Sequence, residues 1–368
     1  MGTLLKPRLT VRRKAIQANY AEICRYAPGV EICPVVKSQA YGLQAVEIVR
    51  ALIACGCRNF YVSVIAEGIE LREEFSDIQI NVLNGLQEGT EKIFSEYRLM
   101  PVVNSVEQLK RWEKMLPNVQ TDCVLNVETG FNRLGIREAD WPSYTPEQWK
   151  KNRIPLFMTH FACVAEDVSD DAERNRIVEE QNRRQFEVYG RALRHFQLPG
   201  SVALDAFLQN TKQLPIAQIR TGAALYGIKV FPEKLNLQPT LLLEAPVLQM
   251  ETIRKGERIG YGATWEAQRD TIVAVLGIGY SHGLPRSLSN RGTVWFHHKN
   301  DRYPAPIIGR VSMGLTTCDV TDIPSSGISG SAMILDEHYT INELCTDADR
   351  LDSEILCNFK QMEWRYEE

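Results

Sequence analysis

The chain has 368 residues, and its 42 lysines and arginines against 46 aspartates and glutamates give a net charge of −4. This balance provides no basic surface of the kind that nucleic-acid binding needs. No apolar run approaches the roughly 20 residues of a membrane-spanning helix, and the N-terminus lacks the hydrophobic core of a secretory signal. The nine cysteines and six histidines show neither disulfide-framework nor metal-ligand spacing. We therefore expect a cytoplasmic protein without a metal site, and with neither nucleic acid nor a membrane as a partner.

The first two-thirds of the sequence alternates short β-rich runs with amphipathic helical stretches. Eight strands are predicted, over residues 32–37, 59–64, 79–84, 99–104, 122–127, 155–160, 201–205 and 218–226. Ser105 is suited to cap a helix over 106–116, with Gln108 at the capping-box position. Eight strands separated by helices indicate an α/β fold, a parallel (β/α)8 barrel of the TIM type, which we place at 10–235.

The pattern changes near residues 231–239, where prolines interrupt the chain. Further β-rich runs then follow one another without intervening helices, over residues 240–253, 271–277, 293–298, 305–311 and 316–320. Consecutive strands of this kind are typical of a separate, mainly antiparallel sheet. We therefore predict a C-terminal β domain over 236–368, with the N-terminal segment 1–9 as a candidate addition to it.

The most informative local feature is a lysine at the end of the first predicted strand. The apolar run 32–36 stops at Lys37, and the pair Tyr41-Gly42 follows four residues later. Because burial disfavours the charged form, a lysine held in a concave site has a lowered pKa and becomes a nucleophile. Taken by itself, the segment fits better a lysine that reaches solvent from a strand end.

Several polar residues follow predicted barrel strands and would gather at the C-terminal rim, where barrel enzymes have their active sites. These residues are Lys37, Asn126, Arg133, His160, Asn210, Thr211 and Arg220. In such barrels the loops after the seventh and eighth strands often bind phosphate. Thr211 and the run Thr221-Gly222-Ala223 supply a hydroxyl and accessible backbone N–H groups in those two loops.

At this point the sequence shows a family resemblance. The run Val35-Val36-Lys37-Ser38-Gln39-Ala40-Tyr41-Gly42 resembles the pyridoxal-phosphate lysine motif of alanine racemases. The resemblance continues in family order through residues 128–135, 159–162, 220–227, 259–265, 279–283 and 308–313. These motifs extend over nearly the whole chain, so together they are far more specific than any one of them.

The resemblance implies a fold-type III pyridoxal-phosphate enzyme in which Lys37 would hold the cofactor covalently. His160 would stack on the pyridine ring of the cofactor, and Arg220 would face the ring nitrogen. The contacts to its phosphate would come from the Tyr41 side chain and from the loops after the seventh and eighth strands, which contain Asn210, Thr211, Gly222 and Ala223.

The resemblance also implies a homodimer with shared active sites. Arg133 would contact the cofactor and the substrate carboxylate, while Tyr261 and the Met313 backbone would enter the partner subunit's site. Racemisation removes a proton from one face of the α-carbon and returns one to the other, so it needs two acid–base groups. Lys37 would serve one face and Tyr261 the other. Arginines in the region would favour the ionised form of the tyrosine, and the family motifs supply Arg133, Arg220 and Arg310.

Three features depart from the family pattern. Many members have a carbamylated lysine at the position of Asn126, where it braces the arginine corresponding to Arg133. Asn126 has no negative charge, so we expect a small anion or a side-chain hydrogen bond near Arg133 in its place. Gly314 replaces the acidic residue that usually follows the methionine. The chain after 354–360 lacks the usual arginine-rich ending, which leaves a second phosphate-binding tyrosine unidentified.

The leading hypothesis is therefore an alanine racemase that interconverts L- and D-alanine and supplies D-alanine for peptidoglycan precursors. A broader-specificity racemase, acting on serine as well as alanine, is the first alternative. A decarboxylase with the same architecture is disfavoured because its C-terminal cysteine motif is not evident. A non-catalytic pyridoxal-phosphate carrier of the related barrel-only family is disfavoured because a carrier needs no β domain with a second base.

Overall fold

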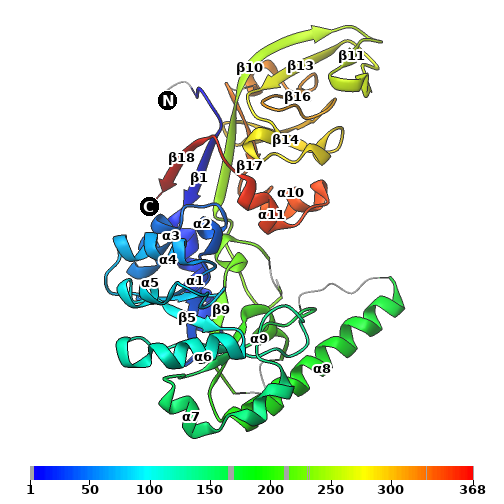
Figure 1. The fold of residues 1–368 in the computed structure, drawn as a ribbon. Coiled ribbons are helices and arrows are strands. Elements are labelled where there is room, and N and C mark those ends of the chain that lie inside the picture. The colour runs from blue at the N-terminus through cyan, green and yellow to red at the C-terminus, as the bar shows by residue number, and fades with distance from the viewer. Residues whose placement is uncertain are drawn as a thin grey trace.

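The computed structural model describes residues 4–164, 170–210, 215–229, 231, 233–328 and 330–367. Two large sheets occupy opposite ends of the molecule, and the N- and C-terminal segments lie side by side at the second one (Figure 1). The first sheet has eight parallel strands in the order β2-β9-β8-β7-β6-β5-β4-β3, which confirms the predicted barrel. The strands are β2 (Glu31–Pro34), β3 (Asn59–Val62), β4 (Gln79–Val82), β5 (Met100–Val103), β6 (Val124–Asn126), β7 (Phe157–Met158), β8 (Gly200–Ala203) and β9 (Ile216–Thr221).

The barrel closes through the residues that immediately precede Lys37. The backbone N–H of Val35 donates to the carbonyl of Thr221 at 2.6 Å, and that of Val36 donates to the carbonyl of Tyr61 at 2.8 Å. Val35 also forms a parallel bridge with Tyr61. The chain is therefore hydrogen-bonded to the last strand and to the second strand at the point where it leaves the sheet, which fixes the position of Lys37.

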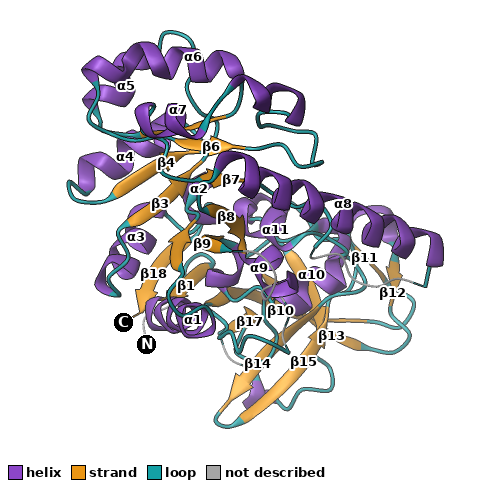
Figure 2. Ribbon diagram, turned by 90° about the horizontal axis from the view of Figure 1, so that it is seen from below, coloured by secondary structure: helices purple, strands orange, loops and turns teal. Residues whose placement is uncertain are grey.

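Helices lie outside the barrel strands (Figure 2). They are α1 (Arg13–Tyr26), α3 (Ala45–Ala54), α4 (Ile65–Glu74), α5 (Glu91–Glu96), α6 (Val106–Met115), α7 (Pro146–Lys151), α8 (Ala172–Phe196) and α9 (Leu204–Asn210). Ser105 caps α6 as predicted, because its Oγ accepts the N–H of Gln108 at 3.2 Å. The Gln108 side chain instead accepts the N–H of Asn104 at 2.9 Å, so the reciprocal bond of a capping box to Ser105 was wrongly expected.

All eight barrel strands end earlier than predicted, and the seventh and eighth show why. The seventh stops at Ala203, and the Asp205 carboxylate accepts the N–H of Ala206 at 2.9 Å within the first turn of α9. The eighth stops at Thr221. Beyond Gly222 the chain forms the 3-10 helix η3 (Ala223–Tyr226), where the N–H of Leu225 donates to the Gly222 carbonyl at 2.9 Å. In both places a local hydrogen bond competes with strand pairing.

The second sheet combines the two ends of the chain. Strand β1 (Arg8–Arg12) pairs antiparallel with β10 (Leu241–Ile253) and parallel with β18 (Glu363–Glu367). The remaining strands of this sheet are β13 (Thr271–Leu276), β14 (Thr293–His298), β15 (Asp301–Pro306), β16 (Thr316–Asp319) and β17 (Ser331–Leu335), and β11 (Arg258–Ile259) pairs with β12 (Trp265–Glu266) separately. The predicted strand 305–311 was wrong, because β15 begins at Asp301 to form a hairpin with β14.

Two helices follow β17, α10 (Ile341–Ala348) and α11 (Asp352–Asn358), which the sequence analysis did not anticipate. They join the β domain to the barrel. The Asn342 side chain donates to the carbonyl of Gly227 at 3.0 Å. Helix α11 packs against Gly42 so closely that a Cβ there would lie 2.6 Å from the carbonyl oxygen of Leu356. No helix in the described ranges is long and apolar enough to cross a membrane.

Candidate active site

Lys37 begins a left-handed turn, α2 (Lys37–Tyr41). The four residues after Lys37 have φ between 52° and 58°, and Gly42 has a φ of 87°. Left-handed backbone costs roughly 1–2 kcal/mol for each non-glycine residue, so other contacts must hold this turn. Glu67 supplies them: one carboxylate oxygen accepts the N–H of Ser38 at 2.5 Å, and the other accepts the N–H of Ser63 at 2.7 Å.

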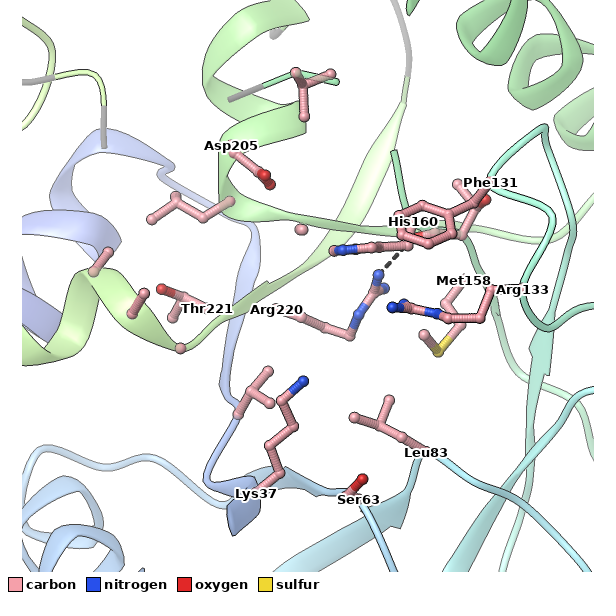
Figure 3. Close-up of a pocket in the computed structure, with 18 of the residues that line it drawn as sticks. Lys37, Ser63, Leu83, Phe131, Arg133, Met158, His160, Asp205, Arg220 and Thr221 are labelled. Carbon is pink, nitrogen blue, oxygen red and sulfur yellow. Dashed lines mark hydrogen bonds between the residues drawn. The ribbon is translucent and has the colours of Figure 1, made fainter. Parts of the chain in front are cut away.

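The turn directs Lys37 into a cavity of about 900 Å³ at the C-terminal ends of the barrel strands (Figure 3). The lining comes from the barrel together with Leu351 and Asp352 at the start of α11. Burial, and then the positive charge of Arg133, lower the pKa of Lys37. The neutral amine that a nucleophile or base requires is therefore favoured at this position.

Arg220 crosses the floor of the cavity from β9 (Figure 3). Its guanidinium is buried and donates to the hydroxyl of Ser201 at 2.7 Å and to the carbonyl of Thr159 at 2.5 Å. The Ser201 hydroxyl donates in turn to Gln218, whose amide donates to Glu31 at 2.9 Å. Two side chains thus connect the buried cation to a carboxylate outside the cavity.

His160 lies above Arg220 in Figure 3, with its ring centroid 5.3 Å from that of Phe131. Burial, and then the positive charges of Arg220, Arg133 and Lys37, lower the pKa of His160 to about 3. The imidazole is therefore neutral at physiological pH. An uncharged, half-buried ring beside a cationic floor suits stacking better than proton transfer.

The loop after β9 forms a narrow recess against α2. A Cβ on Gly222 would lie 2.4 Å from the hydroxyl oxygen of Tyr41, so only glycine lets the backbone approach it this closely. Burial raises the pKa of Tyr41 to about 12, which keeps the hydroxyl a hydrogen-bond donor. The buried hydroxyl of the neighbouring Thr221 has no hydrogen-bond partner among the described residues. Ala223 also lines the cavity here.

Arg133 reaches the cavity from an exposed loop, with its guanidinium carbon 4.2 Å from the centre of the Phe131 ring. The Glu128 carboxylate accepts the Arg133 backbone N–H at 3.1 Å. Asn126 donates to the side-chain oxygen of Asn104 at 2.7 Å and to the carbonyl of Leu134 at 3.1 Å. It therefore anchors the loop that carries Arg133 through the backbone.

Two of the predicted site residues cannot be placed, and one residue that was not predicted lines the cavity. Asn210 ends α9, but its side chain and all of Thr211 lie outside the described residues. Asp205, five residues earlier, lines the cavity instead and points into it in Figure 3. The sequence contained a usable signal, since Asp205 ends the predicted strand 201–205, the same kind of position as Lys37.

The two β-domain residues do not line this cavity within the described part of the chain. Tyr261 begins the 3-10 helix η4 (Tyr261–Ala263) and is 67% exposed, and Met313 is 63% exposed. Nη1 of Arg310 lies 3.2 Å from where a Cβ on Gly262 would be, so a cation sits beside the Tyr261 loop. The structure thus brings Lys37, Tyr41, Arg133, His160, Arg220, Gly222 and Ala223 together, apart from Tyr261 and Met313.

Comparison with known proteins identifies the family. The model of the alanine racemase N-terminal domain matches residues 11–230, and that of the alanine racemase C-terminal domain matches residues 240–366. The chain belongs to the alanine racemase family. The alanine racemase of Acidiphilium cryptum is 34% identical over 354 residues, 95% of each chain. The catabolic alanine racemase of Rhizobium johnstonii is 34% identical over 366 residues, 95% of this chain and 91% of that one.

Solved alanine racemases share the fold from end to end. The Bartonella henselae enzyme, whose structure has covalently bound pyridoxal phosphate, matches with a TM-score of 0.85 at 27% identity over 98% of this chain and 99% of that one. The biosynthetic enzyme of Pseudomonas aeruginosa has the same TM-score at 25% identity, over 99% of each chain. Both domains of this alanine racemase family member therefore have counterparts in complete solved enzymes.

Proposed function

We propose that this protein interconverts L-alanine and D-alanine with pyridoxal phosphate as its cofactor. The observation that carries the proposal is Lys37, held by a left-handed turn at the floor of a large cavity with its pKa lowered by burial. A broad range of relatives named alanine racemase, both biosynthetic and catabolic, supports the reaction.

The residues around Lys37 fit the cofactor. A lysine of lowered pKa suits a covalent link to an aldehyde carbon, and the neutral His160 ring suits one face of a pyridine. The unpartnered Thr221 hydroxyl and the recess between Tyr41 and Gly222 suit phosphate oxygens. We assign the remaining phosphate contacts to the Ala223 backbone, Asn210 and Thr211.

Each of the protein's own groups then has a separate role in the reaction. Pyridoxal phosphate, when bound, withdraws electrons from the substrate α-carbon and makes its proton removable. Arg133 binds the substrate carboxylate, and Lys37 holds or moves the proton on one face. Arg220 retains its proton in proteins, so it presents a fixed positive charge to the ring nitrogen and gives no proton there. Protonation of a cofactor carbon in place of the substrate α-carbon is thereby suppressed.

The second acid–base group is Tyr261 of a second copy in a homodimer. Supporting this assignment, the β domain exposes a group of large apolar side chains that a partner would cover. These are Leu248, Met250, Tyr261, Tyr280, Met313 and Leu315. In this dimer the Met313 backbone helps to bind the substrate carboxylate in the partner's cavity.

The acidic side chain beside Arg133, that of Glu128, accepts the backbone N–H of Arg133. No ion pair of Arg133 occurs in the described ranges, and Asn126 directs its amide to Asn104 and Leu134. We propose that a small anion such as chloride binds near Asn126 and Arg133 and neutralises part of this charge. The physiological role we propose is cytoplasmic supply of D-alanine for peptidoglycan precursors.

A broader-specificity racemase is the second candidate, and Gly314 favours it. A Cβ on Gly314 would meet nothing nearer than the His282 ring, at 4.0 Å. The segment beside Met313 therefore leaves space that a larger substrate side chain could use.

A racemisation assay in deuterated water, across a panel of L- and D-amino acids, tests these proposals. We expect deuterium at the α-carbon of both alanine enantiomers, and absorption by a cofactor that borohydride fixes on Lys37. Exchange that is faster with serine than with alanine would select the broader racemase. Cofactor uptake without any exchange would indicate a carrier, and no cofactor uptake at all would refute the proposed function.

A further inference from the structure

The phosphate end of the cavity contains a carboxylate. In (β/α)8 barrels the loops after the seventh and eighth strands form the usual phosphate site. Here the eighth strand leads into Thr221 and Gly222, and the seventh, β8, leads into Asp205. All three residues line the same cavity, and Figure 3 shows Asp205 and Thr221 on the same side of it. A negatively charged side chain therefore faces the place where an anion is expected.

Asp205 is electrically coupled to the groups around it. Burial raises the pKa of Asp205, while the backbone N–H groups of Ala206 and Asp205 and the charge of Arg220 act in the opposite direction. The negative charge of Asp205 in turn contributes to the raised pKa of Tyr41, after burial and the charges of Cys357 and Asp352. Asp205 thus lies within electrostatic reach of the Tyr41 hydroxyl, which borders the recess at Gly222.

No described ion pair neutralises Asp205. Its carboxylate accepts backbone N–H groups, that of Ala206 at 2.9 Å, and the nearby guanidinium of Arg220 donates to Ser201 and Thr159. The titratable groups that face the same space come from every neighbouring element. They are Lys37 and Tyr41 of α2, Glu128 and Arg133 after β6, His160 after β7, Arg220 of β9, Lys229 and Glu233 after η3, and Asp352 of α11, with Cys357 of α11 acting on Tyr41 through its charge.

We propose that Asp205 must bind a proton when this cavity takes up the phosphate group, so that the phosphorylated cofactor binds more tightly at low pH than at high pH. A phosphate monoester carries a charge of about −1.5 to −2 near neutrality. An ionised carboxylate beside it is repelled, whereas a protonated carboxyl donates a hydrogen bond to a phosphate oxygen. Proton uptake therefore changes Asp205 from a group that repels the phosphate into a group that binds it.

This inference rests on the proposed use of pyridoxal phosphate and concerns only its phosphate. Pyridoxal, which lacks the phosphate, reacts with Lys37 in the same way. The ratio of the dissociation constants for pyridoxal phosphate and pyridoxal therefore cancels the titration of Lys37, and comparing this ratio between the wild type and an Asp205 variant also cancels the titration of the phosphate itself. This ratio is measured on the full-length chain by absorbance titration between pH 5.5 and 8.5.

The decisive variant is Asp205→Asn, which keeps an oxygen to accept the Ala206 N–H and removes the charge. At pH 8.5 we expect it to bind pyridoxal phosphate at least about tenfold more tightly than the wild type, with pyridoxal affinity changed less than about twofold. At pH 5.5, where proton uptake by wild-type Asp205 costs less free energy than at pH 8.5, the difference should shrink to less than about threefold. Asp205→Ser, which also removes the charge, serves if the asparagine variant does not fold.

Asp352→Asn is the matched control, because Asp352 lines the same cavity and is half-buried like Asp205, but it belongs to α11 rather than to the segment after a barrel strand. We expect less than about a threefold change, since the usual phosphate site of a (β/α)8 barrel is formed by the loops after the seventh and eighth strands. An unchanged ratio in both Asp205 variants, or an equal gain from Asp352→Asn, would overturn the role of Asp205. Failure of every protein to take up either aldehyde would instead refute the proposed function itself.

Discussion

The barrel and the β domain present their chemical groups in opposite ways. Lys37, His160 and Arg220 lie in a cavity where burial lowers each of their pKa values, and neighbouring cations lower those of Lys37 and His160 further. Tyr261 and Met313 of the β domain stand on an exposed surface with large apolar neighbours. The difference between the two regions fits the proposed homodimer, in which a single chain prepares one half of the active site and a second copy supplies the other half.

The largest expected effect comes from removing Lys37 from the barrel cavity. Lys37→Ala should lower racemisation by at least about 10⁴-fold, because it deletes both the covalent anchor and one of the two acid–base groups. Steady-state rates and cofactor absorbance measure this loss. Lys229→Ala is the control, since Lys229 lines the same cavity but pairs with Glu343. An equal loss in both variants would show that any cavity lysine matters.

Removing the Tyr261 hydroxyl from the exposed surface of the β domain should leave the barrel cavity intact. Tyr261→Phe should reduce turnover by about 10²- to 10⁴-fold through loss of one proton-transfer group. Its cofactor absorbance and affinity should match the wild type, because Tyr261 does not line the cavity within its own described chain. Unchanged turnover would exclude the tyrosine from the reaction, and loss of cofactor would give it a structural role.

The left-handed turn provides a smaller effect confined to the barrel half. Glu67→Ala removes the acceptor of the Ser38 and Ser63 N–H groups, and should lower the free energy of unfolding by about 1–3 kcal/mol and weaken cofactor binding. Urea unfolding and cofactor titration measure both quantities. Glu70→Ala is the matched control, because within the described residues the exposed Glu70 accepts only from the Gln39 side chain. Equal losses would argue against a specific brace.

His160 gives the smallest effect, a pH dependence of stability. Its pKa is about 3 in the folded chain and near 6.5 when unfolded, so the unfolded state binds more protons between these values. The free energy of unfolding should therefore decrease as pH falls through this window, by at most about 1.4 kcal/mol per pH unit from this residue. Urea titrations at pH 7 and 5 should show a shallower decrease for His160→Gln. Parallel decreases in both proteins would contradict a neutral His160.

The sequence predicted the barrel well because each of its strands is a short, apolar run between helical segments. It predicted the ends of β8 and β9 poorly, since the turns at Asp205 and Gly222 depend on local hydrogen bonds. The pairing of β1 with β18 joins opposite ends of the chain, and no local pattern encodes such a contact.

The site residues were also predicted in part. Family motifs brought Lys37, Arg133, His160 and Arg220 to one cavity. Glu67 was missed because its role appears only when α4 packs beside the turn after Lys37. Asp205 was missed because the phosphate contacts were assigned to the polar pair at 210–211, whereas Asp205, two residues after the end of β8, lines the cavity.

The most direct test of the two-copy site mixes two inactive proteins. Full-length Lys37→Ala and Tyr261→Phe chains are unfolded together, refolded in equal amounts and assayed for alanine racemisation. In a shared-site dimer the mixed species has one site with both mutations and one with neither, so random pairing should restore about a quarter of wild-type activity. Activity no higher than that of the separate variants, in a mixture shown to contain mixed dimers, would contradict a site completed by a second chain.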